Sequence, residues 1–467
     1  MPESHAKTQP MPELNRFFEH RLRDGRVLLI TELGRIACLS GQEYSGFKQG
    51  KLDSELSKKL EEAAILMTPK GRERAVNDLR LRYMHVSGSV SLHIVNPTMR
   101  CNQNCLYCYA NAFPLNSKGH DMDEETASKA LDFIWQCPNK NIVIEFQGGE
   151  PLANFPIIEF MVEQAKKRKG KKVHWRLVSN FSLLDEEKAA FFQKNKIFDL
   201  CTSLDGPKEV HDKNRPLAKK SSFEQTVHWI KALKKDYGFR HLGALCTVTK
   251  NSLPFAKEIV DTYLELGFPD ITPVPIRKIG LAEKNWAKIG YSWQEYFAFW
   301  KELADYCISL SKKGREISDQ ISVLMLSKID RVKPSYHTCY SKPCGSALVQ
   351  CSYQPNGDIY ACDEAKAEPI FKIGDIFQGY KAVFTSPQAL NMVSLSSSLN
   401  FLCNQCKFKG FCSICPVLTY CSQKNPVPKL ALDESCRLKK AQFSFLLEKL
   451  FGEDRPVLKK WLKGRQL

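Results

Sequence analysis

The sequence predicts an α/β fold: an open, partial (β/α)6 barrel with a small N-terminal unit before it and a cysteine-rich region after it. Two observations support this prediction. Strand-like and helix-like stretches alternate six times between about residues 90 and 276, and ten of the 18 cysteines lie between residues 339 and 436. Parallel strands need helical crossovers, so the alternation indicates a parallel sheet. Six units are fewer than the eight of a closed barrel, and we therefore expect an open one.

Composition narrows the functional classes. The chain has 467 residues, with 68 Lys and Arg against 51 Asp and Glu, and a formal charge of +17. No apolar run approaches the roughly 18 to 20 residues of a membrane helix, and residues 1–13 lack the apolar core of a secretory signal. We therefore expect a cytoplasmic protein with no membrane partner. In a reducing cytosol, 18 cysteines indicate metal binding or catalysis before disulfides.

Residues 14–85 are predicted to form a separate α+β unit. Two short strands are expected over 26–31 and 35–39, joined by a turn at Gly34, and apolar residues then recur at helical spacing. A hairpin followed by helices resembles a winged-helix peptide-recognition element, which implies binding of a substrate's leader. The alternative is a scaffold extension without a ligand.

The barrel is predicted over residues 88–330. Its chemistry should lie at the carboxyl ends of the strands, as in other barrels of this kind. The expected strands are 91–96, 141–146, 172–179, 198–204, 242–249 and 270–276. The expected helices between them are 124–135, 157–167, 185–193, 223–235 and 254–266. A turn-rich region over 339–440 and a final segment 441–467, with an amphipathic helix over 441–450, complete the chain.

Three cysteines follow the first barrel strand at spacings of four and three: Cys101, Cys105 and Cys108. A loop of this size can place three thiolates around one corner of an iron–sulfur cubane. The fourth iron then has no protein ligand, unlike the closed four-cysteine sites of ferredoxins. The alternative is a zinc knuckle with a distant fourth ligand.

The Cx3Cx2C spacing at this position resembles the radical S-adenosylmethionine (SAM) superfamily. The resemblance implies a [4Fe–4S] cluster that binds SAM and cleaves it reductively to a 5′-deoxyadenosyl radical. It places Glu150 near the SAM amine and Arg215 on its carboxylate. Many relatives have Gly-x-Gly after this arginine, whereas residues 218–222 here depart from that pattern. The SAM-binding residues that the resemblance implies are Tyr107, Gln147, Gly148, Gly149, Glu150, Ser179, Asn180, Ser203, Asp205 and Arg215. For Asp205 and Arg215 the alternative is an ordinary turn with an exposed ion pair.

The C-terminal cysteines resemble the SPASM extension of radical SAM peptide maturases, which holds two auxiliary [4Fe–4S] clusters. The resemblance implies two ligand sets. The first is Cys344, Cys351, Cys362 and Cys415. The second is Cys403, Cys406, Cys412 and Cys436. The last close pair, Cys412 and Cys415, is one residue closer than usual, so Cys421 or Cys339 could replace Cys415. A pair of zinc sites is the alternative reading of these cysteines.

Longer stretches, including residues 144–152, 203–207 and 410–417, resemble the His-Xaa-Ser system radical SAM maturases (HxsB). That resemblance implies a peptide-modifying oxidoreductase that oxidises or cross-links residues of a small ribosomal precursor peptide with His-Xaa-Ser repeats. A second radical SAM maturase and a low-potential electron donor are the implied partners. One alternative is a sulfatase-type maturase that oxidises Ser or Cys of a protein. A zinc-ribbon nucleic-acid-binding protein is the other; the basic charge favours it, and the ordered barrel motifs oppose it.

Asp363 is the predicted catalytic residue because it directly follows Cys362. In sulfatase-type relatives an aspartate after the corresponding cysteine is the proposed general base, and a positioned carboxylate can take that role. The alternative is that Asp363 caps a turn or pairs with Lys366.

Overall fold

The computed structural model describes residues 13–195, 199–330, 338–397, 401–425, 427 and 429–463. The chain divides into two compact units. The first comprises Met1–Met84, Met325–Ser335 and Leu399–Cys412; the second comprises His85–Leu324, Tyr336–Ser398 and Ser413–Leu467. This division differs from the expected one, because most of the cysteine-rich region belongs with the barrel and residues 399–412 belong with the N-terminal unit.

The first unit begins with an antiparallel sheet of three strands in the order β1-β2-β3. Only β2 and β3 were expected from the sequence. The strands are β1 (Phe17–Arg21), β2 (Val27–Thr31) and β3 (Ile36–Leu39). Three helices follow: α1 (Gly41–Lys48), α2 (Ser54–Glu62) and α3 (Pro69–Tyr83). Each helix starts after a side-chain cap, supplied in turn by Ser40, Asp53 and Thr68, which satisfies a backbone N–H that the helix leaves without a partner.

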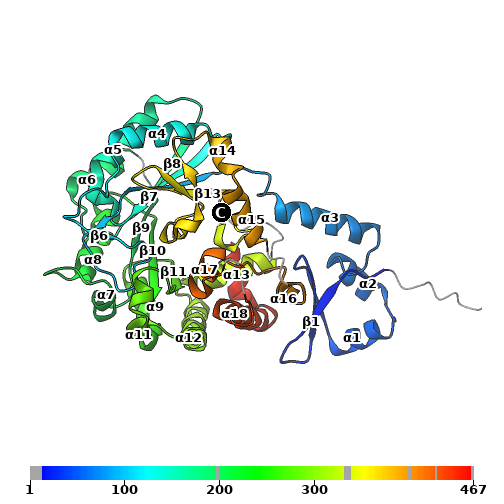
Figure 1. Cartoon of the computed structure of the whole chain (residues 1–467). Coiled ribbons are helices and arrows are strands. Elements are labelled where there is room, and N and C mark those ends of the chain that lie inside the picture. The colour runs from blue at the N-terminus through cyan, green and yellow to red at the C-terminus, as the bar shows by residue number, and fades with distance from the viewer. Residues whose placement is uncertain are drawn as a thin grey trace, which may run out of the picture. The chain divides into compact units, whose positions relative to one another are not determined.

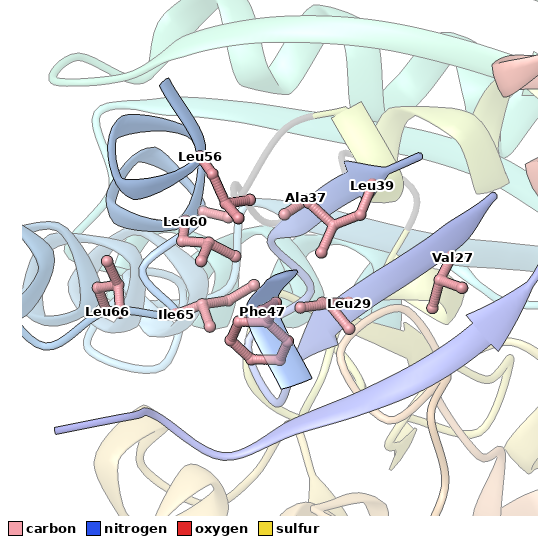
Figure 2. Packing of buried hydrophobic residues seen from close by; sticks show 10 residues of the cluster. Val27, Leu29, Ala37, Leu39, Phe47, Leu56, Leu60, Ile65 and Leu66 are labelled. Atoms are coloured by element: carbon pink, nitrogen blue, oxygen red, sulfur yellow. The ribbon is translucent and has the colours of Figure 1, made fainter. Parts of the chain in front are cut away.

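One face of this sheet packs on the helices that follow it, as Figure 2 shows. Burial of this apolar surface is what stabilises so small an α+β unit. The buried cluster consists of Val27, Leu29, Ala37, Leu39, Phe47, Leu56, Leu60, Ala63, Ile65 and Leu66.

The second unit is built on a ten-stranded sheet in the order β12-β11-β10-β9-β8-β7-β4-β13-β14-β15. The strands from β12 to β13 are parallel to their neighbours. The barrel strands are β4 (Leu92–Thr98), β7 (Asn141–Gly148), β8 (Lys172–Val178), β9 (Asp199–Ser203), β10 (Leu242–Val248), β11 (Asp270–Pro275) and β12 (Ser318–Asp319). The predicted open α/β barrel is therefore confirmed, with a short seventh strand beyond the six expected.

Helices line the outer side of the parallel strands in Figure 1. The helices of this part of the chain are α4 (Glu124–Trp135), α5 (Phe155–Lys167), α6 (Glu186–Lys194), α7 (Lys208–Asn214), α8 (Ser222–Lys235), α9 (Ala256–Glu265), α10 (Leu281–Lys284), α11 (Trp286–Ile289), α12 (Trp293–Lys312) and α13 (Gln320–Asp330). A separate short pair, β5 (Arg100–Cys101) and β6 (Phe113–Pro114), frames the loop after β4.

The cysteine-rich region continues the barrel sheet. Its first strand, β13 (Gln350–Tyr353), pairs in parallel with β4, and β14 (Asp358–Tyr360) and β15 (Lys372–Asp375) add antiparallel strands. Buried polar side chains fasten the β4–β13 pair: Nδ1 of His93 lies 2.8 Å from the Tyr353 hydroxyl. The predicted boundary near residue 330 is therefore not a boundary of the sheet.

The remaining helices are α14 (Tyr380–Phe384), α15 (Pro387–Ser396), α16 (Phe401–Asn404), α17 (Pro416–Gln423), α18 (Glu434–Phe451) and α19 (Arg455–Lys463). Helix α18 begins seven residues earlier than the predicted 441–450, since Asp433 caps its first turn. Cys436 therefore lies at a helix N-terminus. In the described part of the chain, no helix combines the length and apolar character needed to span a membrane.

Candidate active site

The loop with Cys101, Cys105 and Cys108 leaves the carboxyl end of β4, as predicted. The backbone N–H of Leu106 donates to the carbonyl of Asn214 over 3.0 Å, which ties the loop to the segment after β9. Burial raises the pKa of the Cys101 thiol to about 12 and that of Cys105 to about 11. These thiols are therefore neutral unless a metal holds them as thiolates, and metal binding here releases protons.

Gly148 and Gly149 are necessary for packing of the chain itself. Gly148 has φ +131°, and a Cβ there would lie 2.3 Å from the Thr98 carbonyl oxygen; a Cβ on Gly149 would lie 2.3 Å from that of Arg100. The N–H of Gly149 donates to the Thr98 carbonyl over 3.0 Å. The glycines were expected to let the backbone approach a ligand, and what they approach is the strand that leads into the cysteine loop.

Glu150 is almost fully buried, with 1% of its surface exposed. Its carboxylate accepts hydrogen bonds from the Ser179 hydroxyl (2.7 Å), the Asn180 N–H (2.8 Å) and the Leu152 N–H (3.1 Å). Burial nevertheless raises the pKa of this carboxyl. The structure thus brings together three of the predicted SAM-binding residues, Glu150, Ser179 and Asn180, at the ends of β7 and β8. The Glu150 carboxylate among them can balance a cationic amine.

Tyr107, Asp205 and Arg215 form a second buried group. The Tyr107 hydroxyl donates to Asp205 Oδ2 over 2.7 Å, and Arg215 Nη1 donates to the same hydroxyl oxygen over 2.6 Å. Burial opposes the charge on Arg215, yet Cys105, Tyr107 and Asp205 together raise its pKa. Both Asp205 and Arg215 are buried, so the alternative of an exposed ion pair is wrong.

The cysteine loop also contains a buried amide that fits a bound cofactor. Gln103 accepts from Arg215 Nε over 3.3 Å, and its backbone N–H points at Cys101 Sγ over 3.4 Å. Its Nε2 atom has no hydrogen-bond partner within the described residues. A buried donor without a partner is costly, and an iron–sulfur group held by the neighbouring thiolates would supply an acceptor. Across the same described part, no three His, Cys, Asp or Glu side chains are grouped to hold a single metal ion.

The other predicted SAM contacts are placed less directly. Ser203 is the last residue of β9 and is half-buried. Gln147 Nε2 donates to Glu145, and its Oε1 lies 3.5 Å from the Tyr109 hydroxyl. In the stretch 218–222, Lys219 adopts φ +61°, a left-handed conformation that favours glycine. The turn is held by Asp212, which accepts from the Phe223 N–H over 2.8 Å.

Asp363 lies beside the cysteine loop. Its carboxylate accepts a short hydrogen bond from the hydroxyl of Tyr109, the residue after Cys108. It also pairs with Lys366 Nζ at 2.6 Å, and this ammonium donates to Asn96 Oδ1 over 3.1 Å. Each of the two interpretations of Asp363 is therefore compatible with a contact. Lys366 is its ion-pair partner, and the hydrogen bond from Tyr109 links it to the Cys101–Cys108 loop.

Three of the first predicted set of auxiliary ligands are neighbours. The Ser346 hydroxyl lies 3.3 Å from Cys344 Sγ and also hydrogen-bonds the Cys362 thiol. Cys344 and Cys362 interact electrostatically with Cys415, whose thiol pKa burial raises to about 12. Cys421 instead lies by Glu368, with its Sγ 3.8 Å from Oε1. This arrangement supports Cys415 over Cys421 as the ligand.

Cys351, the fourth residue of that set, lies elsewhere. It is inside β13, fully buried, and its thiol neighbours are Tyr353 and Cys137. Cys339, in contrast, interacts with Cys344 and Cys362, and its carbonyl accepts from the Ser413 hydroxyl over 3.0 Å. Electrostatic interactions therefore link Cys339, rather than Cys351, to Cys344 and Cys362, and the ligand set of this cluster stays a prediction.

The second predicted set is divided between the two units. Cys403, Cys406 and Cys412 belong to the first unit and Cys436 to the second. The three form a compact turn, since the N–H of Cys406 donates to the Cys403 carbonyl (3.1 Å) and that of Cys412 to the Phe408 carbonyl (3.0 Å). Cys436 N–H bonds to the capping Asp433 over 3.0 Å. The grouping of these four residues stays a prediction.

Arg277 is a site residue that sequence reasoning missed. It follows β11 at the carboxyl end of the sheet, pairs with Glu364, and its charge acts on both Tyr109 and Cys415. A signal was available, because predicted site residues also follow β4, β7, β8 and β9. No spacing motif marks it.

Comparison with known proteins identifies the barrel. Residues 95–272 match the model of the Radical SAM superfamily. This segment is a radical SAM domain. Such domains use a [4Fe–4S] cluster and SAM, so the prediction of these cofactors is confirmed, while Cys101, Cys105 and Cys108 stay the predicted cluster ligands. The protein's closer assignment to HxsB finds no support among these matches.

The relatives and neighbours extend beyond the barrel. A cysteine-type anaerobic sulfatase-maturating enzyme of Clostridium perfringens is 26% identical over 341 residues, covering 70% of this chain and 89% of its own. The solved structure of native anSMEcpe with bound AdoMet superimposes with a TM-score of 0.67 at 22% identity, over 78% of this chain and all of the other. Streptococcus suis SuiB bound to precursor peptide SuiA gives 0.55 at 14% identity, over 86% and 94%. These structural matches show the shared fold.

Proposed function

We propose that this radical SAM protein is a maturase that modifies a peptide or protein substrate at the carboxyl ends of its barrel strands. The observation that carries the proposal is the Tyr109–Asp363 hydrogen bond. Tyr109 follows a cofactor cysteine, and Asp363 follows Cys362, so one contact joins the radical SAM loop to the C-terminal cysteine region. Sulfatase maturases and SuiB, which resemble this chain in sequence or fold, are named for protein or peptide substrates.

When bound, the cluster and SAM supply reductive cleavage of a sulfonium and a hydrogen-abstracting 5′-deoxyadenosyl radical. The chain's own residues bind and orient. Glu150 offers a buried carboxylate to the SAM amine, and Arg215 offers a guanidinium to its carboxylate. Tyr109 and Lys366 hold the Asp363 carboxylate in one orientation, from which it can accept a proton that the modified residue loses. Glu150, Arg215 and Asp363 are buried, and Tyr109 and Lys366 are partly buried, which limits the access of water to the site.

Co-expression tests this proposal. The protein is expressed anaerobically with a small peptide encoded beside it, and the peptide is analysed by mass spectrometry. A loss of two mass units supports oxidation or cross-linking, and fragmentation distinguishes an oxidised Ser or Cys from a cross-link. His-Xaa-Ser repeats in the modified peptide, and a requirement for a second radical SAM protein, would support the HxsB assignment. An unmodified peptide together with SAM cleavage that proceeds unchanged without it would contradict a peptide substrate.

We further propose that the first auxiliary cluster is held by Cys339, Cys344, Cys362 and Cys415. Matched variants test this assignment. Cys339→Ser should lower the iron content of the reconstituted protein by about four per chain. Cys351→Ser should leave it unchanged, because that thiol is packed against Tyr353 inside the sheet. The reverse result would restore the assignment made from the sequence.

The N-terminal sheet is the proposed site for the substrate's leader. β3 pairs only with β2 among the described strands, so its other edge can add a peptide strand. The Thr31 N–H donates to the Arg35 carbonyl over 2.9 Å. Hydrogen-bonded pairs alternate along an antiparallel ladder, and Cys38, opposite Leu28, falls in the class whose N–H points away from β2.

Cys38→Pro removes that outward N–H and leaves the β2–β3 ladder intact. Peptide affinity should fall about tenfold, the scale of one or two main-chain hydrogen bonds, while SAM cleavage without peptide stays normal. Cys38→Ala, which keeps the N–H, is the matched control. Equal peptide affinities for the two variants would mean that the leader does not bind this edge.

A further inference from the structure

The three-stranded sheet of the first unit is covered on both faces. All five residues of β2 are buried, although only Val27 and Leu29 of this strand belong to the cluster drawn in Figure 2. Leu28 is opposite His20 in β1 and therefore shares its face. The His20 ring lies 6.0 Å from the ring of Phe408. The second face thus carries the segment 401–412, which lies more than 350 residues later in the chain.

That segment holds Cys403, Cys406 and Cys412, so its packing fixes a ligand loop. Two turns interlock there. A Cβ on Gly34, which has φ +88° in the β2–β3 turn, would lie 2.6 Å from Cε1 of Phe411, and a Cβ on Gly410 would lie 2.5 Å from the Gly34 nitrogen. Phe408 and Phe411 are 3% and 1% exposed. The turn between Cys406 and Cys412 therefore has little freedom of its own.

Arg82, in the last turn of α3, connects these two turns. Its Nη1 donates to the carbonyl of Gly410 and its Nη2 to the carbonyl of Leu33, both through short hydrogen bonds. Only 6% of the residue is exposed. A buried guanidinium bound to two carbonyls is expensive to leave half-satisfied. It therefore holds the hairpin turn and the cysteine turn at one spacing.

Polar contacts at the edge of this packed region also hold the cysteine turn against the sheet. Lys409 Nζ pairs with Glu32 Oε1 at 3.2 Å, and Arg16 Nη1 reaches the same oxygen at 3.2 Å. Arg16 Nη2 also donates to the carbonyl of Asn404 over 3.0 Å. Exposed pairs of this kind contribute little stability each, but they bind both ends of the cysteine turn to the same sheet.

We propose that the N-terminal sheet positions the Cys403–Cys412 ligand loop, and that Arg82 is the positioning residue through which it acts. The inference rests on the proposed function, because it takes these cysteines as ligands of an auxiliary cluster. It gives the N-terminal unit a role beyond leader binding: assembly of that cluster depends on the sheet, and a peptide strand added to the sheet acts on the loop that holds the cluster.

The test uses the full chain, reconstituted anaerobically, with the variants Arg82→Met and Arg80→Met. Arg80 is exposed on the same helix and is the matched control. Wild type and Arg80→Met should bind about twelve irons, and Arg82→Met about eight. Cys403→Ala/Cys406→Ala shows the electron paramagnetic resonance spectrum expected when this cluster alone is missing. Arg82→Met should reproduce that spectrum and keep the change in the Cys101 cluster's signal on addition of SAM.

The outcomes separate this inference from the proposed function. If wild type itself binds only about four irons, the auxiliary clusters, and the proposed function with them, are contradicted. If wild type binds about twelve and Arg82→Met keeps its iron content and spectrum, only the positioning role is overturned. Should Arg82→Met fail to fold, Gly34→Ala gives the decision, since its Cβ displaces Phe411 without leaving a buried cation. A wild-type spectrum from folded Gly34→Ala overturns the inference, and selective loss or distortion of the Cys403 loop's signal supports it.

Discussion

The cysteine loops at Cys101–Cys108 and Cys403–Cys412 are held in different ways. The first leaves the end of a parallel strand, and buried polar groups that follow the neighbouring strands β8 and β9, such as Asn180 and Arg215, contact it. The second is a turn held by apolar rings and by Arg82 from helix α3 of the first unit. The first loop is therefore supported by the barrel, the same fold that its Cx3Cx2C spacing predicts. The second depends on a residue 328 positions away, and no motif reports that dependence.

The largest expected effect separates the two loops. Replacing Cys101, Cys105 and Cys108 together by Ala should abolish SAM cleavage and lower iron from about twelve to about eight per chain. The Cys403 loop should keep its iron, because the contacts described for it come from the first unit. Iron analysis and an assay for 5′-deoxyadenosine check this. A fall to about four irons would show that the two loops do not assemble independently.

Asp363→Asn examines the link between the first loop and the C-terminal cysteines. If Asp363 acts as a base, Asp363→Asn should lower the amount of peptide product about a hundredfold or more. Iron content and SAM cleavage should stay near normal. Asp358→Asn, which breaks a partly exposed pair with Lys372, is the control. If iron falls together with product, the residue is structural. Full product formation by Asp363→Asn would exclude both roles.

Gly148→Ala tests how far the SAM site depends on close backbone packing. The added Cβ meets a backbone carbonyl at 2.3 Å in a left-handed conformation, so we expect a loss of about 3 kcal/mol of stability and weaker SAM binding. Gly25 has φ +86°, and nothing lies within 4 Å of a Cβ added there. Gly25→Ala therefore measures the cost of the backbone conformation alone. Thermal unfolding of both variants gives the comparison, and equal losses would show that the contact with Thr98 is unimportant.

The smallest effect concerns pH. His211 Nδ1 accepts the Asp205 N–H over 3.2 Å, and burial, helped by Arg215, lowers the pKa of this imidazole to about 3. The unfolded chain takes up the proton near pH 6.5, so stability present above that pH is lost as the pH falls toward 3. His211→Asn keeps an acceptor and cannot titrate. Its melting temperature should drop less between pH 7.5 and 5.5 than that of wild type, and an equal drop would assign the acid sensitivity to other groups.

Local pattern was enough to predict the barrel. Helix α4 was predicted at its observed bounds, and β7 and β10 within two residues. Apolar periodicity and capping by Asp or Ser depend only on residues that are close in the sequence. The same holds for Glu150 and Asp205, which follow the carboxyl ends of β7 and β9, because these ends meet at one edge of a parallel sheet. β1 was missed because Phe17–Arg21 carries few apolar residues and gains its place from pairing with β2.

Long-range packing explains what the sequence could not predict. The resemblance to SPASM proteins placed Cys351 with the auxiliary ligands, yet pairing of β13 with β4 buries that thiol inside the sheet. The attachment of residues 401–412 to the N-terminal sheet rests on Gly34, Phe411 and Arg82, and no local pattern indicates that these three residues meet. The one local hint was β2 itself: five consecutive buried residues indicate a strand covered on both faces.

Strand β13 limits how this protein can be rebuilt. Its register against β4 sets Ser352 beside Ile94 and Tyr353 beside Val95, and Asn96 reaches across to Ser352 over 3.0 Å. A chimera that transplants residues 339–463 to another radical SAM barrel must therefore reproduce an edge strand with these side chains. Exchange of the cysteine-rich region as an independent cassette, cut at residue 330, would leave β4 with an exposed edge and a row of buried polar groups without partners.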